Sequence, residues 1–446
     1  MQAAGICMKR QDKECAGRQK IREEVFLHVW LPVITEYVEW VLENAVKSGK
    51  KRLYFLARDG YMMYLLAEKL IKAGNLEIEI RYLKVSRYAI RNAEYYFNGK
   101  DALETLCAGG IDITFEKIMK RANLTEEEAL HIAGLAGRTE TYQKALNHRQ
   151  LHELKKELSR IDRLFFYIKK HAEICYETTA AYLRQEGLLE KIPYALVDSG
   201  WVGSLQLSIQ RVLMHAASEN IRLEGYYFGI YERPKGTGAE QYKAFYFGEK
   251  QVRRKVRFSN CLFETVFSAP EGMTCGYAVK PESMKIQSPV YAAWESGTEN
   301  PNAEVIERFA KLLSEYASAY TEAAAESQSA IYRDKRARIR FVGNLIRPMM
   351  GNPVREEARA FGEMLFCDDV LELRLQPVAA RWDEEELRRN RFFNKLLIRL
   401  NLKPDILRES AWPEGSIAVL GIRTAENIRQ ERLYKRLMYL RKAVGK

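Results

Sequence analysis

The sequence lacks the patterns that mark membrane-spanning, secreted and zinc-binding proteins. No apolar run reaches about 18 residues, the length that a spanning helix needs. The N-terminal stretch MQAAGICMKRQDKECAGRQK is too polar for a secretory signal. The seven cysteines are scattered and include no C-x-x-C pair, and the six histidines show no metal-ligand spacing. These absences predict a cytoplasmic protein with reduced thiols.

The chain is long, apolar and positively charged. Its 446 residues suffice for two or three domains, and an apolar content of 47% is ample for large cores. The net charge is +12, and residues 381–446 hold 16 Lys and Arg against 9 Asp and Glu. Such an excess favours anionic partners, namely phosphates, nucleic acid or an acidic membrane surface. No recognised nucleic-acid motif supports the second of these, so we expect no nucleic acid.

Strand and helix patterns alternate in the first part of the chain. Segments 52–57, 61–74 and 76–86 have the patterns of a buried strand, a helix and an alternating strand, which together make a βαβ unit. Thr125 and Glu128 have the spacing of a capping box. Further strands are expected at 192–200, 221–232 and 242–249, and helices through most of 100–190 and 300–446. This alternation predicts an α/β fold with a mainly parallel sheet.

The turn DSGWVGS follows the strand expected at 192–200 and opens a helix. Asp198, at the strand end, suits hydrogen bonds from sugar hydroxyls. Gly200, Gly203 and Ser204 then form a Gly-x-x-Gly-Ser segment, which suits a phosphate at the start of a helix because its N–H groups lack internal partners. In open α/β sheets ligands bind at the carboxyl ends of the strands, where this turn lies.

A second turn, ARDGY, has the same layout after the strand at 52–57. Arg58 offers forked donors for a di-anionic phosphate, and Gly60 lets such a group approach the backbone closely. Asp59 lies between Arg58 and Gly60 in the sequence and is the acid of this turn. Two acid-bearing turns on one sheet predict a shared phosphate-binding crevice more strongly than either turn does alone.

Several segments together resemble a known group of proteins. The acid-then-small-residue turn is similar to the phosphoribosyl-diphosphate loop of type I phosphoribosyltransferases, and LARDGYMMYLLAEKL lies where that family has its diphosphate loop. The segments YFLARDGY, YLKVSRYAIR, ALVDSGWVGSLQ, GYYFGIY and FETVFSAPEGMTCGY resemble a phosphoribosyltransferase-like group from bacterial polysaccharide clusters. The resemblance covers roughly residues 25–280, and residues beyond them add little to it.

The resemblance implies a glycosyltransferase that moves 5-phosphoribose from phosphoribosyl diphosphate (PRPP) to a hydroxyl of a glycan or lipid-linked glycan, releasing diphosphate. It implies Mg²⁺ with the diphosphate, and a separate haloacid-dehalogenase-like phosphatase that removes the 5-phosphate. The expected catalytic base is Asp59, with Glu264 second. The expected substrate-binding residues are Arg58, Gly60, Arg87, Asp198, Ser199, Gly200, Gly203 and Ser204.

The expected organisation follows from the same segments. A type I phosphoribosyltransferase-like core would span 21–99 and 190–280, with a helical insertion at 100–189. A basic tail at 1–20 would precede it, and a mainly helical, basic domain would follow at 281–446. Ser199 departs from the usual pair of adjacent acids in the phosphoribosyl loop, and Asp59 has no counterpart in the usual diphosphate loop.

Each candidate also has a structural interpretation. Asp59 would cap the helix that it precedes, and Arg87 and Arg91 would belong to a solvated helix face. Trp201 would plug the end of the sheet, which is favoured over stacking on a sugar. Glu264, flanked by apolar residues, would form a structural ion pair.

The alternative function is a non-catalytic nucleotide- or phosphate-binding or scaffold protein of polysaccharide assembly. The basic stretches RRNRFFNKLLIRL and YKRLMYLRKAV fit peripheral contact with the inner face of an anionic membrane, although a solvated helix face is favoured.

Overall fold

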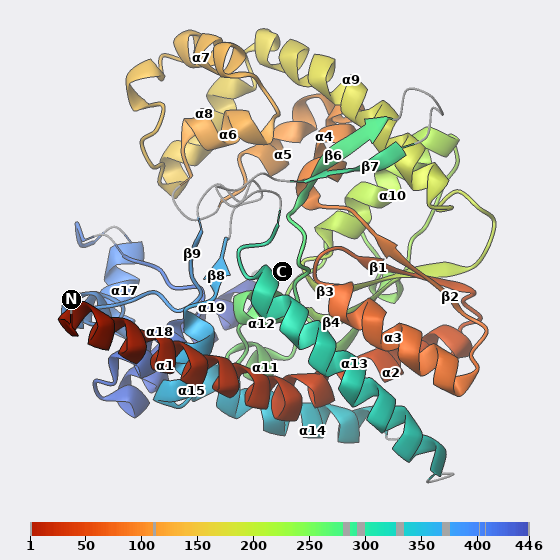
Figure 1. Ribbon diagram of the computed structural model, residues 1–446. Coiled ribbons are helices and arrows are strands. Elements are labelled where there is room, and N and C mark those ends of the chain that lie inside the picture. Colours follow the sequence, from red (N-terminus) through yellow and green to blue (C-terminus); the bar gives the residue numbers. More distant parts are fainter. Residues whose placement is uncertain are drawn as a thin grey trace.

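The computed structural model of the protein (Figure 1) describes residues 2–109, 113–279, 286–291, 299–326, 334–367, 375–400, 402–405 and 407–444. A five-stranded sheet lies at its centre, with every neighbouring pair parallel. The expected α/β class with a parallel sheet is therefore confirmed. In chain order the strands are β1 (Arg52–Leu56), β2 (Glu79–Leu83), β3 (Tyr194–Trp201), β4 (Gly225–Ile230) and β5 (Tyr242–Phe247).

The strand order across the sheet is β2-β1-β3-β4-β5. The chain therefore adds β2 on one side of β1 and then returns to add β3 on the other side. Helix α3 (Tyr61–Gly74) links β1 to β2, and α10 (Ser204–Ala217) links β3 to β4. The reversal makes the gap between β1 and β3 a topological switch point, where the loops at the carboxyl ends diverge and leave a crevice.

Both faces of the sheet are covered by helices (Figure 1). Leu53 and Phe55 of β1 belong to one core cluster with residues of α2 (Leu31–Lys47), α13 (Ala303–Glu326) and α14 (Lys335–Ile346). Their neighbours Tyr54 and Leu56 belong to a second cluster, which includes residues of α4 (Arg87–Asn98), α9 (Asp162–Gln185) and α10. The alternation follows from the two-residue period of a strand, and burial on both faces explains why RLYFL carries so few polar residues.

Between β2 and β3 the chain forms a helical cluster with a core of its own. Its members are η2 (Gly99–Asp101), α5 (Ala102–Leu106), α6 (Phe115–Arg121), α7 (Glu126–Leu135), η3 (Thr139–Thr141), α8 (His148–Leu158) and the first half of α9. The capping box at the start of α7 is present, because the Thr125 side chain accepts from the Glu128 N–H and the Glu128 side chain accepts from the Thr125 N–H. This cluster occupies the stretch expected to be a helical insertion.

The N-terminus differs from the expected tail. Residues Gln2–Val25 form α1, which continues through the π-helical turn Phe26–Trp30 into α2. Arg22 donates to the backbone oxygen of Ala360 at 2.6 Å, so α1 is tied to the C-terminal part of the chain. The stretch Glu14–Lys47 is long and apolar enough, by length and composition alone, to cross a membrane, although it contains no uninterrupted apolar run of about 18 residues. However, 72% of its apolar window is buried inside the protein, as in an ordinary core helix.

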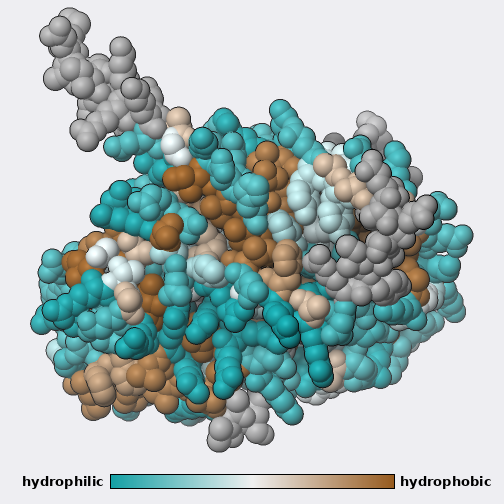
Figure 2. All heavy atoms as spheres, turned by 90° about the horizontal axis from the view of Figure 1, so that it is seen from below, coloured by the Kyte–Doolittle hydropathy of each residue, from teal (hydrophilic) through white to brown (hydrophobic). Residues whose placement is uncertain are grey.

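Phe361 and Trp412 of the C-terminal half belong to the same main core as the sheet. The C-terminal half also has a smaller core of its own, made by Ala380, Trp382, Leu387, Ile417 and Ile428. Figure 2 shows the molecule from below the view of Figure 1, where much of the surface is hydrophilic and hydrophobic residues gather near the centre and at the lower left. The remaining elements are η4 (Ala239–Gln241), α11 (Val252–Lys255), α12 (Asn260–Val266), β6 (Thr274–Val279), β7 (Ile286–Tyr291), η5 (Arg347–Gly351), α15 (Arg355–Gly362), β8 (Leu365–Phe366), β9 (Gln376–Pro377), α16 (Glu384–Arg389), α17 (Phe392–Arg399), α18 (Pro413–Leu420) and α19 (Thr424–Val444).

Candidate functional site

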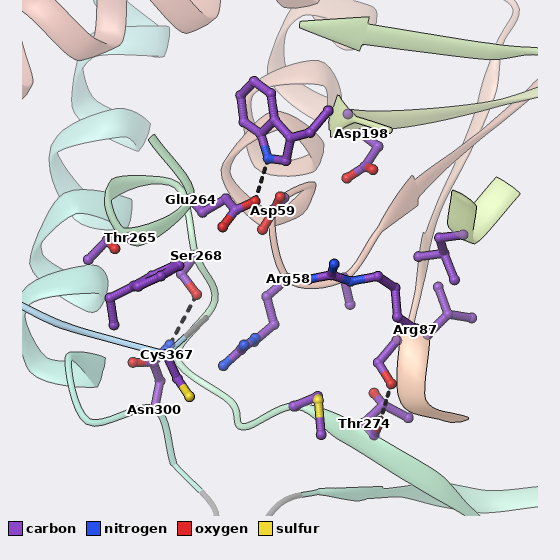
Figure 3. A pocket seen from close by; sticks show the side chains of 18 of the residues that line it. Arg58, Asp59, Arg87, Asp198, Glu264, Thr265, Ser268, Thr274, Asn300 and Cys367 are labelled. Atoms are coloured by element: carbon purple, nitrogen blue, oxygen red, sulfur yellow. Dashed lines mark hydrogen bonds between the residues drawn. The ribbon is translucent and has the colours of Figure 1, made fainter. Parts of the chain in front are cut away.

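A cavity of about 200 Å³ lies at the carboxyl ends of β1 and β3, at the switch point of the sheet. Both turns singled out in the sequence contribute to its wall, so the expected convergence of the two acid-bearing turns is confirmed. Figure 3 shows the cavity with several of its side chains. The expected site residues on its wall are Arg58, Asp59, Arg87, Asp198, Gly200, Gly203, Ser204 and Glu264.

The turn after β1 presents Asp59 to the cavity but not Gly60. The N-cap residue of α3 is Gly60, and the Asp59 carboxylate accepts a hydrogen bond from the Ser199 hydroxyl. Asp59 is therefore held by the neighbouring turn. The Gly60 N–H donates to the Leu56 oxygen at 2.7 Å, and a side chain at Gly60 would meet the same oxygen. The expected diphosphate contact at the Gly60 backbone is wrong, because that N–H is engaged and the residue packs against β1.

Ser199 also has a different role from the expected one. It is 1% exposed and does not line the cavity. Its hydroxyl donates to Asp59 across the gap between the two turns. A serine in place of a second acid therefore gives a bridge that holds Asp59, and Ser199, expected among the substrate-binding residues, lies outside the cavity wall.

The turn after β3 has an unusual backbone. Gly200 has φ +112°, Trp201 +76° and Gly203 +66°. Positive φ costs glycine little, but for a bulky residue such as tryptophan it is a strained conformation of the kind that clusters at functional sites. Side chains at the two glycines would collide with the Gly229 oxygen and the Tyr242 ring. Both glycines are therefore required by the turn itself, in addition to any ligand.

Asp198 and Asp59 form a pair of half-buried carboxylates. Burial raises the pKa of Asp198 well above its ordinary value, and the charge of Asp59 raises it further. Backbone N–H groups following Asp198 and the Arg87 cation partly oppose that rise. Burial also raises the pKa of Asp59, against the Ser199 hydrogen bond and the charge of Arg58. Two like charges in one enclosed place favour a shared proton or an added cation.

Two arginines flank this pair from different elements. Figure 3 shows the Arg87 side chain reaching from the start of α4 toward the aspartates, while Arg58 points toward Asn300 and Cys367. Ser86 caps α4 by accepting from the Ala89 N–H at 3.0 Å, which fixes where Arg87 leaves the helix. Burial lowers the pKa of Arg58, and the nearby Asp59 raises it. The cations and carboxylates therefore face a common space.

The N-terminus of α10 points its first turn at the same cavity, whose wall includes Ser204, Leu205 and Gln206. The first N–H groups of a helix lack intrahelical partners and carry the positive end of its dipole. Arg91 donates to the Ser204 hydroxyl oxygen at 3.3 Å. Arg91 was not among the expected site residues, although its four-residue spacing from Arg87 puts both on one face of α4. This corner suits a phosphate.

Glu264 and Trp201 form the part of the wall between β3 and α12. The Trp201 ring is 9% exposed and packs against Phe258 and Phe263, and its Nε1–H donates to the Glu264 carboxylate. Trp201 thus packs at the end of β3, as expected of a plug, and it also lines the cavity. Glu264 is half-buried and is held by an indole N–H.

The rest of the wall comes from residues that the sequence did not single out. Asn300 donates to the Ser268 hydroxyl at 3.0 Å, and Asn302 both donates to and accepts from the Leu365 backbone, at 2.7 and 2.9 Å. These contacts join segments up to 63 residues apart. No local pattern marks such residues, because only the tertiary fold brings their segments together.

Magnesium fits the paired aspartates better than any other part of the wall. Among the described residues, no three His, Cys, Asp or Glu side chains are grouped as a metal site. Magnesium, however, is commonly held by one or two carboxylates together with substrate phosphates. Asp59 and Asp198 supply two carboxylates whose repulsion a divalent cation would relieve.

The sequence matches no protein-family model and no curated protein. The geometry of the cavity is therefore the evidence on which a function is proposed.

Proposed function

We propose that the protein is a glycosyltransferase that moves 5-phosphoribose from PRPP to a sugar hydroxyl of a bacterial surface glycan, with a type I phosphoribosyltransferase-like core. One observation carries the proposal: the turns after β1 and β3 meet at one cavity, each bringing an acid beside cations. An activated pentose phosphate needs hydrogen-bond acceptors for its hydroxyls and cationic or helix-terminal donors for its phosphates. The cavity wall supplies both kinds of group.

The donor is placed by matching its charges to the wall. The 5-phosphate lies at the N-terminus of α10, with a donor from Ser204, whose hydroxyl oxygen accepts from Arg91 at 3.3 Å. Asp198 accepts from the ribose hydroxyls. Arg58 and Arg87 neutralise the diphosphate, because guanidinium forks match phosphate oxygens. Magnesium, held by Asp59 and Asp198 with the diphosphate, would supply further neutralisation of the leaving group.

The reaction is a substitution at the anomeric carbon of the ribose. The bond from that carbon to the diphosphate oxygen breaks, and the electron pair leaves with the diphosphate. The acceptor oxygen forms the new bond and its proton passes to a carboxylate base. The transition state resembles an oxocarbenium ion, so the wall acts by stabilising the leaving charge and orienting the acceptor. Asp59 and Glu264 are the two candidate bases, and both lie near Arg58; Asp59 takes the proton only where Asp198 holds the magnesium without it.

The product keeps its 5-phosphate. Neither the VDSG nor the ARDG turn has the second aspartate of an Asp-x-Asp phosphatase motif. We therefore propose that a separate phosphatase, of the haloacid-dehalogenase-like kind, follows this enzyme and acts on the phosphorylated glycan.

Calorimetry with PRPP, with and without Mg²⁺, tests the donor site. We expect wild-type protein to bind PRPP more tightly with Mg²⁺, and Asp198→Ala to weaken that binding. Binding of PRPP without diphosphate release in the presence of glycan acceptors would instead favour a non-catalytic phosphate-binding module. If wild-type protein binds neither PRPP nor diphosphate, the proposed function is wrong and a scaffold role is left.

A further inference from the structure

A second cavity, of about 350 Å³, adjoins the first. We call the cavity between β1 and β3 the first chamber and this one the second chamber. Ligand pockets usually measure about 300–1,000 Å³, so the first chamber alone is small for a donor together with an acceptor. Several residues line both chambers, which makes them neighbouring parts of one cleft: Arg87, Trp201, Val202, Glu264, Phe366 and Cys367.

The C-terminal helix α19 builds the outer wall of the second chamber. Tyr439 of α19 stacks on Tyr231 at the end of β4, with ring centroids 5.6 Å apart and an interplanar angle of 18°. Lys255 is 3% exposed and donates to the backbone oxygens of Tyr231 and Glu249, at 2.9 and 2.6 Å. Aromatic stacking and buried hydrogen bonds therefore hold this wall in shape without a ligand.

The chemistry of the second chamber differs from that of the first. Its carboxylates and cations balance, and one pair, Lys442 and Glu232, lies 4.0 Å apart. The first chamber instead adds a helix N-terminus to its arginines, which favours an anion. The second chamber combines aromatic rings, acceptors and donors, which suits a neutral ligand rich in hydroxyls. Its charged residues are Arg87, Glu232, Glu249, Lys255, Glu264 and Lys442.

We propose that the second chamber binds the acceptor, a neutral sugar unit, and that Glu264 is the general base. This inference rests on the proposed function. Glu264 lines both chambers, whereas Asp59 lines only the first. A hydroxyl presented from the second chamber meets the Glu264 carboxylate as it reaches the anomeric carbon. The acceptor O–H bond breaks, its proton passes to Glu264, and the oxygen replaces diphosphate on the ribose.

The chamber is tested by filling it or by removing its outer wall. Asn260→Phe fills it at α12, and Tyr439→Ala removes the stacked ring of α19. Leu437→Ala is the matched control, because Leu437 lies on α19, is 41% exposed and does not line the chamber. The probes are methyl glycosides of neutral hexopyranoses in both anomeric forms. Saturation-transfer NMR measures their binding with PRPP present, and mass spectrometry detects the 5-phosphoribosylated product.

We expect at least one methyl glycoside to bind wild-type protein and the control. Both chamber variants should weaken that binding by about tenfold or more while keeping the PRPP dissociation constant. The inference is overturned if both chamber variants bind and react like the control, or if wild-type protein binds PRPP but none of the glycosides. If wild-type protein does not bind PRPP at all, the proposed function fails. The sugar-binding part of the inference is then decided by whether the NMR signals show a glycoside bound to wild-type protein and not to the chamber variants.

The base is tested by comparing Glu264→Gln with Asp59→Asn. Glutamine keeps the oxygen that accepts from the Trp201 indole. We expect Glu264→Gln to lower kcat for transfer by about 10²–10⁴-fold, with PRPP and glycoside binding kept, and to abolish the acid limb of the pH–rate profile. Asp59→Asn should act mainly through Mg²⁺-dependent PRPP affinity. If Asp59→Asn instead lowers kcat with PRPP affinity kept, and Glu264→Gln leaves kcat unchanged, the base is Asp59.

Discussion

Replacing Asp198 with asparagine should change how the stability of the protein depends on pH. Burial and the charge of Asp59 raise the pKa of Asp198 in the folded protein. The folded state therefore holds a proton that the unfolded state releases, and the free energy of unfolding falls as pH rises from the ordinary pKa to the raised one. The slope in that interval is about 1.4 kcal/mol per pH unit for one proton. Asparagine carries no such proton, so the variant should lack this part of the slope.

Urea denaturation followed by circular dichroism, from about pH 5 to about pH 9, measures the effect. At the alkaline end Asp198→Asn should be more stable than wild type by about 1.4 kcal/mol for each unit of pKa elevation. The matched control is Asp101→Asn, because Asp101 is exposed in η2 and lies outside the cavity. Parallel curves for wild type and Asp198→Asn over the whole range would refute the description of the two aspartates as a mutually repelling, enclosed pair.

Three further substitutions test other parts of the structure. Arg338 is 2% exposed and pairs with three glutamates of α2, so Arg338→Met should lower the free energy of unfolding, measured by urea denaturation, by about 3–5 kcal/mol. The control Arg340→Met changes an exposed arginine and should cost less than about 0.5 kcal/mol; equal effects of the two substitutions would contradict the buried ion pairs. Gly203→Ala should lower the free energy of unfolding by more than about 1 kcal/mol, because Gly203 has a positive φ and a side chain there would meet the Tyr242 ring. The control Gly134→Ala, in an open part of α7, should raise it by about 1 kcal/mol, and an unchanged stability of Gly203→Ala in the same urea denaturation would show that the turn relaxes easily. Arg91→Ala should weaken binding of ribose 5-phosphate in calorimetry by about tenfold, and unchanged affinity would remove the phosphate from the corner at Ser204.

Local sequence determined most of the elements and the position of the crevice. Short apolar runs such as RLYFL are typical of strands buried on both faces, and parallel strands need long crossovers, usually helices, between them. The acid-bearing turns after β1 and β3 were visible in sequence for the same reason, because a turn between a buried strand and a helix has a fixed place at the carboxyl edge. The capping box of Thr125 and Glu128 is likewise a local hydrogen-bond pattern, and it was found as predicted.

Tertiary structure alone decided which atoms face the cavity. Whether Ser199 meets a ligand or Asp59 depends on the register of β3 against β1, which no short segment encodes. The Gly60 N–H donates to the Leu56 oxygen because the turn folds back on its own strand, so this N–H does not face the cavity. The Asn300 wall and the α19 side of the second chamber come from residues far along the chain. They are brought there by tertiary packing that buries apolar surface, and this driving force is non-directional and leaves no motif in the sequence.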